Sequence, residues 1–180
     1  MTADVAAIQT PSGGARVIRD DAEAVEVAGA LAAEFAVEAA DRDARRRLPT
    51  AEVDRLSTSG LLAITVPREY GGADVSNRTV AEVFRLLAVA DPNIAQIPQS
   101  HFVYVNALRH QGTPAQRKFF FSEVLAGKRF GNAQSEAGTR HVQDYRTRLV
   151  ARDGGEFVLN GTKHYSTGAL FADWIPVLAR

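Results

Sequence analysis

The chain has 180 residues, with 21 basic and 21 acidic side chains and no cysteine. Balanced charge disfavours nucleic acid as a partner, and the lack of cysteine excludes disulfides, thiolate metal sites and a cysteine nucleophile. An apolar share of 46% is typical of a globular protein, and without a spanning run or a secretory signal we expect it in the cytoplasm, away from membranes.

Residues 1–19 contain a Pro-Ser-Gly-Gly cluster and no periodic apolar pattern, which predicts a disordered arm. Residues 20–127 predict a helical domain. Apolar positions spaced three or four apart indicate helices over 20–47, 51–59 (capped by Thr50), 78–90 (capped by Ser76 or Asn77) and 93–110, with Pro98 as a kink or the true start of the last. Thr113-Pro114 with Gln116 predicts a capping box that opens a final helix.

Beyond Gly127 the apolar pattern alternates. Residues 145–151 and 157–159 predict two strands joined by a Gly-rich turn. Residues 174–180 resemble an apolar strand that stops without a turn, which indicates a truncated chain with a bare strand edge. The expected fold class is α+β, an all-helical domain followed by a partial β domain over 128–180.

Familiar chemical motifs are missing from the sequence. The histidines show no HExxH and no helical ligand spacing, so we expect no metal site. The sequence also lacks the glycine patterns of hydrolase nucleophile elbows, Rossmann loops and P-loops.

Two polar segments remain, FGNAQSEAG at 130–138 and LNGTKHYSTG at 159–168. Small polar side chains beside closely approaching backbone suit the edge of a flat heterocycle. The alternative is a pair of ordinary hairpin turns with satisfied hydroxyls.

The order of these features resembles the acyl-CoA dehydrogenase superfamily. That family opens its β domain with a segment close to aFaLTEPxAGSD and continues with dGdxyvLNGxKxfIxNA; here the matching stretches are FGNAQSEAG and DGGEFVLNGTKHYSTGALFAD. PREYGG at 67–72 resembles the family's PExyGG. The resemblance covers residues 20–180 and implies that the β part begins an antiparallel, barrel-like middle domain and that a C-terminal helical bundle is missing.

Residues 135–140 depart from the dehydrogenase pattern, and the serine associated with acyl-CoA binding is not obvious. The two segments look more like the reduced-flavin monooxygenase branch, which includes sulfur-acquisition oxidoreductases. This resemblance implies an FMNH2-dependent monooxygenase that oxidises a small organosulfur compound through a flavin C4a-hydroperoxide, with a separate flavin reductase and a homotetramer at full length. The alternatives are an FAD-dependent acyl-CoA dehydrogenase and an inactive fragment.

The resemblance also implies roles for particular residues. Asn132 and Ser135 would lie along one edge of the flavin, and Ser166, with Tyr165 and Thr167 beside it, near N5 and C4a. At such a site the Ser166 hydroxyl or a nearby carbonyl would accept a hydrogen bond from N5–H while water is excluded.

His101 and Tyr104 lie one helical turn apart and therefore face the same way. In the monooxygenase interpretation they line the substrate cavity and act as catalytic groups; the alternative is a core pair bonded to backbone. Lys163 and His164 either contact phosphate or lie on a solvated turn. Arg140 and His141 are candidates for substrate specificity or for contact with a phosphate.

Overall fold

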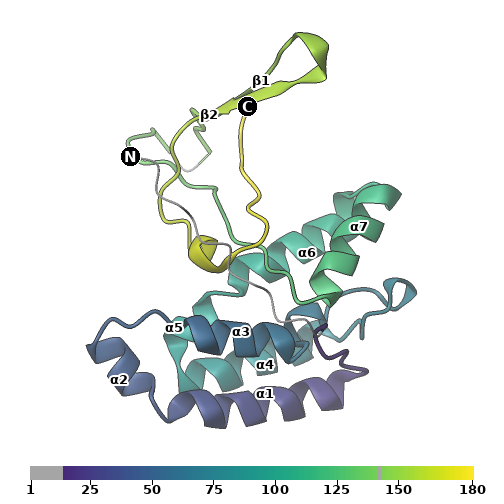
Figure 1. Ribbon diagram of the computed structural model, residues 1–180, viewed down its shortest axis with the longest axis vertical. Helices are drawn as coiled ribbons and strands as arrows, with labels where there is room; N and C mark the ends of the chain where they lie inside the picture. Colours follow the sequence, from purple (N-terminus) through teal and green to yellow (C-terminus); the bar gives the residue numbers. More distant parts are fainter. Residues whose placement is uncertain (1–13, 142) are drawn as a thin grey trace.

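The computed structural model describes residues 14–141 and 143–180. The helices pack against one another in the lower part of the molecule, and the β part lies above α6 (Gln99–Gln111) and α7 (Pro114–Leu125) (Figure 1). The remaining helices are α1 (Asp21–Ala36), α2 (Ala39–Ala44), α3 (Thr50–Thr58), α4 (Asn77–Ala90) and α5 (Pro92–Gln96). No helix among the described residues is long and apolar enough to cross a membrane.

Two of the expected helices are broken in the structure. The helix expected over 20–47 divides after Ala36, and the Arg42 guanidinium donates to the carbonyl of Phe35, an end group that a continuing helix would have used itself. The helix expected over 93–110 divides at Pro98, which is the residue before α6. Pro98 therefore marks a helix start, the second of the two alternatives.

The caps follow local chemistry at most helix starts. Ser76 accepts from the amide of Thr79, and Thr113 forms the predicted capping box with Gln116. Thr50 is not a cap: it is the first residue of α3, which follows Pro49 without a capping side chain.

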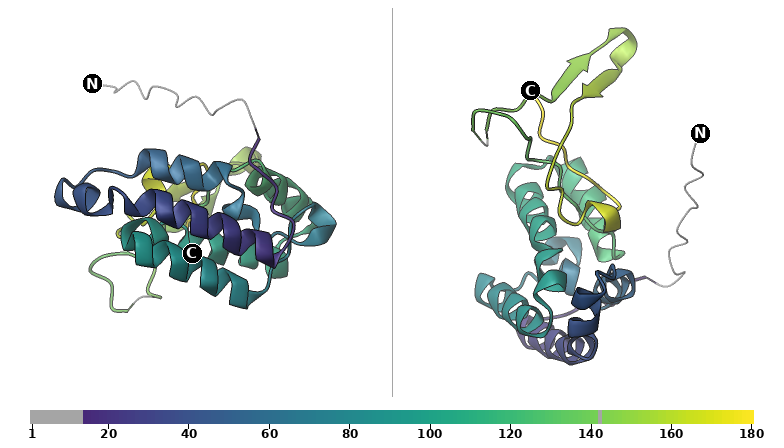
Figure 2. Two further views of the ribbon diagram at one scale, coloured as in Figure 1. Left: turned by 90° about the horizontal axis from the view of Figure 1, so that it is seen from below. Right: turned by 90° about the vertical axis from the view of Figure 1, so that its left-hand side faces the viewer.

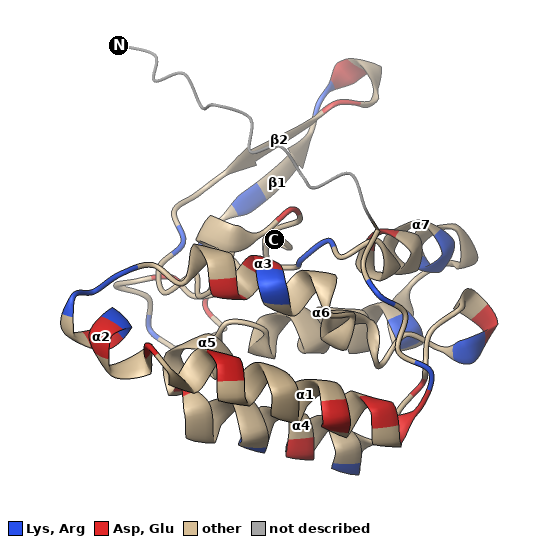
Figure 3. Cartoon of the chain, turned by 60° about the horizontal axis from the view of Figure 1, so that its bottom comes forward, with Lys and Arg blue, Asp and Glu red and all other residues tan. Residues whose placement is uncertain are grey.

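The helical core has two apolar clusters. One lies between α1 and α4 and includes Leu31, Phe35 and Leu87; the other lies under the β part, around Phe121 and Phe130. Figure 2 shows the helices gathered on one side of the molecule and the β part on the other. Acidic and basic residues are interspersed along α3 and α4, whereas the charged residues of α1 are all acidic (Figure 3).

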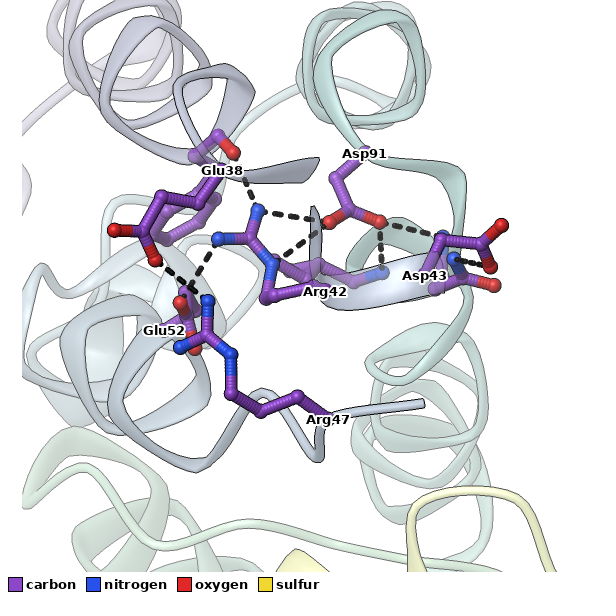
Figure 4. A network of polar contacts seen from close by, with 9 residues as sticks. Glu38, Arg42, Asp43, Arg47, Glu52 and Asp91 are labelled. Carbon is purple, nitrogen blue, oxygen red and sulfur yellow. Dashed lines mark hydrogen bonds and ion pairs between the residues drawn. The ribbon is translucent and has the colours of Figure 1, made fainter. Parts of the chain in front are cut away.

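A buried ionic network joins α2, α3 and α5. The Arg42 guanidinium donates to Asp91 Oδ2 from Nε at 3.1 Å and Nη2 at 2.9 Å, and to Glu52 from Nη1 at 2.9 Å (Figure 4). The Arg42 and Asp91 side chains are 5% and 3% exposed. Asp91 also caps α5 through the amides of Asn93 and Ile94. One carboxylate therefore fixes both a helix start and the position of α2.

The β part contains one antiparallel hairpin, β1 (Arg148–Ala151) and β2 (Phe157–Asn160), with Leu149 opposite Leu159. All eight strand residues are exposed, and the hairpin points away from the helices (Figure 2). β1 is shorter than the strand predicted over 145–151, and β2 is one residue longer than the strand predicted over 157–159. The α+β class is confirmed at this level.

The final apolar stretch is not a bare edge. Trp174 and Val177 form parallel bridges with Phe130 and Ala133, and the amides of Gly131 and Ala133 donate to the carbonyls of Trp174 and Pro176 at 2.9 and 3.1 Å. The expectation of an unpaired strand here is therefore wrong, because the start of the β part lies alongside and satisfies the backbone.

The predicted arm lies partly outside the described residues, at 1–13. Its remaining residues pack against the helices: Ile18 is buried in the core, and the Arg16 amide donates to the carbonyl of Thr58 at 3.0 Å. Arg16 and Arg19 both bind the buried Glu23 carboxylate. The prediction of a disordered arm is therefore wrong for residues 14–19.

Candidate functional site at the junction of the helical and β parts

His101 holds the two parts of the chain together from α6. Its Nδ1 accepts from the Phe130 amide at 3.1 Å, so the proton is on Nε2, which donates to the carbonyl of Leu62 at 2.8 Å. The ring is 1% exposed, and burial chiefly, with the nearby Arg129 charge, lowers its pKa to about 4. Both nitrogens are engaged, so the geometry matches the alternative of a core histidine.

His101 also has no room for a reactant beside it. The ring borders a gap of about 10 Å³ together with Gly168 and Phe171, a space that holds at most about one water molecule. The centre of the Phe130 ring lies 5.8 Å from that of His101 and 6.2 Å from that of Tyr104. His101 and Tyr104 thus lie on the same face of α6, as their spacing predicts, but His101 borders only this small gap.

Tyr104 faces an apolar pocket. This pocket has a volume of about 370 Å³ and lies between α6, α7 and the 174–176 segment. Its lining includes Tyr104, Ala107, Phe120, Phe130, Trp174 and Pro176. The Tyr104 hydroxyl accepts from the Gln134 amide nitrogen at 2.7 Å, which connects the pocket to the first polar segment.

The structure brings the two polar segments side by side. The carbonyl of Ser135 accepts from the His164 amide at 2.8 Å, and the carbonyl of Gln134 accepts from Lys163 Nζ at 3.1 Å. The Asn132 side chain accepts from the Gln134 amide at 3.2 Å and so closes a local turn. Sequence segments about 30 residues apart therefore form one polar surface beside α6.

The loop from Tyr165 to Thr167 exposes its aromatic side chain, while Ser166 and Thr167 are half-buried. Tyr165 adopts a left-handed backbone conformation with φ of +56°, and its side chain is 85% exposed. Such a conformation is strained for an aromatic residue and recurs at ligand sites. Within the described part of the chain, the hydroxyls of Ser166 and Thr167 have no hydrogen-bond partner, nor does that of Ser135.

A buried ion pair lies behind this surface, and sequence reasoning missed it. Lys163 Nζ lies 2.8 Å from Glu136 Oε1, with the two side chains 8% and 5% exposed. Neither expectation for Lys163, phosphate contact or a solvated turn, is correct. The available signal was that Glu136 and Lys163 both match fixed letters of the family patterns, the Glu of TEP and the Lys of NGxK.

Steric crowding explains why a glycine, Gly161, occupies this position of the LNGTK stretch. A Cβ on Gly161 would lie 2.3 Å from the Thr147 hydroxyl oxygen and 2.7 Å from its Cα. Only glycine allows the end of β2 to approach Thr147 so closely. This approach brings Lys163 to Glu136, because Thr147 binds the same carboxylate.

The other histidine candidates do not join this surface. His141 lies on an exposed loop, and its neighbour Arg140 pairs with Asp144 rather than with the 163–167 segment. Among the described residues no cluster of three His, Asp or Glu side chains has the arrangement of a metal site.

Comparison with known proteins decides the family. Residues 20–128, more than half of the chain, match the model of the acyl-CoA dehydrogenase N-terminal domain. The chain belongs to the acyl-CoA dehydrogenase family. The family predicted from FGNAQSEAG, LNGTK and PREYGG is thereby confirmed.

Among its relatives, this family member is 35% identical to a dibenzothiophene monooxygenase of Rhodococcus erythropolis over 85% of the chain and 37% of that protein. It is 32% identical to a probable FMNH2-dependent monooxygenase of Pseudomonas putida over 81% of the chain and 35% of that protein. FMN-bound TdsC of Paenibacillus sp. A11-2 superposes with a TM-score of 0.78 at 32% identity, over 87% of the chain and 39% of TdsC. The chain thus spans less than half the length of these relatives.

Proposed function

We propose that this chain contributes the flavin edge and part of the substrate pocket of an FMNH2-dependent monooxygenase that oxidises a small organosulfur compound. The observation that carries the proposal is the junction itself: an exposed aromatic ring and unpaired hydroxyls on two adjoining segments, next to an apolar pocket. The likeness to flavin monooxygenases supports the same function.

The residues present fit a flat, polar heterocycle. Hydroxyls of Ser135, Ser166 and Thr167 can donate to or accept from ring nitrogens and carbonyl oxygens, and the Asn132 amide nitrogen adds a donor. The exposed Tyr165 ring offers an apolar face for the isoalloxazine. FAD carries the same ring system, so these groups suit reduced FMN and FAD alike.

Reduced FMN, delivered by a separate flavin reductase, supplies the two electrons with which molecular oxygen gives one atom to sulfur and the other to water. The chain's own residues bind and orient the flavin and the substrate, and they exclude water. Ser166 is the acceptor that we assign to the flavin N5–H, and Ser135 and Asn132 hold one ring edge. His101 is left out of this assignment because both of its nitrogens are occupied.

The pocket indicates the class of substrate. Its lining is predominantly apolar and aromatic, and about 370 Å³ is within the range of pockets that hold small ligands. Tyr104 contributes a hydroxyl to this lining, and that hydroxyl is bonded to the Gln134 side chain on the side of the flavin edge. An aromatic sulfur heterocycle fits this lining better than a charged thioester would.

The test supplies the protein with reduced FMN, oxygen and dibenzothiophene, and separates the products by chromatography. We expect a sulfur-oxidised product, and at least about tenfold less of it when Ser166→Ala removes the hydrogen-bond acceptor. Val103→Ala, an exposed position on α6, serves as a control. Reduction of an acceptor dye with butyryl-CoA, and no sulfur oxidation, would instead identify an FAD-dependent acyl-CoA dehydrogenase. Absence of both reactions and of flavin binding would match an inert fragment.

A further inference from the structure

The Glu136 carboxylate is the meeting point of three chain segments. It accepts from Lys163 Nζ at 2.8 Å, from the Thr147 amide at 2.9 Å and hydroxyl at 2.6 Å, and from the Arg146 amide at 2.7 Å. These donors come from the loop after β2 and from the residues that lead into β1. Three of the four donors bind Oε1 and the Arg146 amide binds Oε2, so the carboxylate is held by both of its oxygens.

Lys163 is bound as completely as its partner. Its ammonium donates to Glu136 and to the carbonyl of Gln134 at 3.1 Å, and it lies 4.9 Å from the centre of the Tyr145 ring. An ammonium of this kind, buried and surrounded by a carboxylate, a carbonyl and an aromatic face, is fixed in one place.

The pair is next to the groups assigned to the flavin. Ser135 immediately precedes Glu136, and its carbonyl bonds to the amide of His164, the residue after Lys163. Gln134 bonds to Lys163 through its carbonyl and to Tyr104 through its side chain. Movement of the ammonium would therefore displace Ser135, the 165–167 loop and the Tyr104 hydroxyl relative to one another.

We infer that Glu136 and Lys163 are positioning residues: their ion pair fixes the segment carrying Ser135 against the segment carrying Ser166. The inference rests on the proposed flavin site and explains how two exposed segments keep a common geometry. A site needs its binding groups held to within fractions of an ångström by the residues behind them. The hydrogen bonds from Lys163 and Thr147 keep the pKa of Glu136 well below its usual range.

The experiment titrates FMN into the 180-residue protein and follows flavin fluorescence and absorption. Lys163→Met keeps the length and apolar stem but leaves the Glu136 charge without its partner, and we expect FMN affinity to fall at least about tenfold. Lys163→Arg restores the charge and should recover most of the affinity and the bound-flavin spectrum. Loss of affinity in both the Met and Arg variants to the same extent would overturn the assignment of the ion pair.

Lys128→Met is the matched control. Lys128 pairs with Asp173 at 3.1 Å, with side chains 29% and 26% exposed, and not with residues 134–136. The same substitution at this more exposed pair should leave FMN affinity within about threefold of the unmodified protein. If Lys163→Met does not fold by circular dichroism, Glu136→Gln replaces it, since its amide oxygen still accepts from Thr147.

A second readout separates this inference from the flavin proposal. Amide hydrogen exchange of His164, which bonds to Ser135, reports the junction without flavin, and we expect faster exchange in Lys163→Met than in Lys128→Met. If the unmodified protein binds no FMN, the proposed function fails, and the exchange rates alone decide the positioning role. Unchanged His164 exchange in folded Lys163→Met refutes that role.

Discussion

Mild acid should destabilise this fold through one buried ring. Burial chiefly lowers the pKa of the folded His101 to about 4 from 6.5. Protonation of Nδ1 would also break the hydrogen bond that it accepts from the Phe130 amide. Between pH 4 and pH 6.5, His101 binds a proton in the unfolded chain but not in the folded one. The free energy of unfolding therefore falls as pH drops through this window and levels off below pH 4. From pH 7 to pH 5 the loss is about 2 kcal/mol.

Urea unfolding followed by circular dichroism at pH 7, 6 and 5 measures this loss, which should lower the midpoint by about 1 M. His101→Gln is the control because its amide donates and accepts but does not titrate. Asp21 and Glu23, whose pKa values hydrogen bonds hold at about 2, lose their stabilising effect only at lower pH. Equal losses in the two proteins between pH 7 and 5 would refute a buried, neutral His101.

Other substitutions test the helical part by the same unfolding assay. Arg42→Met leaves the buried Asp91 carboxylate without its partner and should cost about 3–5 kcal/mol; a loss below 1 kcal/mol would contradict the burial of the pair. Thr113→Ala removes a capping box and should cost about 1 kcal/mol. Gly60→Ala places a Cβ 2.1 Å from a backbone carbonyl oxygen at φ +85° and should cost more than about 2 kcal/mol, whereas Gly29→Ala, with open space around it, should raise stability by up to about 1 kcal/mol.

Features set by neighbouring residues could be predicted from the sequence. The capping box at Thr113 depends on residues three apart, and the structure contains it. The break between α1 and α2 could not be predicted in this way, because it accompanies contacts of Arg42 with Asp91, 49 residues later. Ile18 likewise enters the core through contacts with distant helices, which its Gly-rich sequence neighbourhood does not indicate.

The candidate site shows the same division. The two polar segments could be identified from their residues and from the family patterns, and the structure brings them together at Ser135 and His164. The role of His101 could not be predicted from the sequence, because a histidine on an apolar helix face gives the same pattern whether its ring nitrogens are free or hydrogen-bonded. The pairing of Glu136 with Lys163 depends on the path of the chain between them, which periodicity does not describe.

The exposed hairpin and the paired final segment have a consequence for a cleaved chain. Arg152 lies in the turn between β1 and β2, where no side chain of the hairpin is buried, so trypsin should cut there first. The resulting C-terminal fragment would still carry the 174–178 segment, bonded to residues 129–133, and Trp174, packed against the core. The two pieces should therefore remain associated after a single cut, and a gel-filtration column would show one peak where a denaturing gel shows two bands.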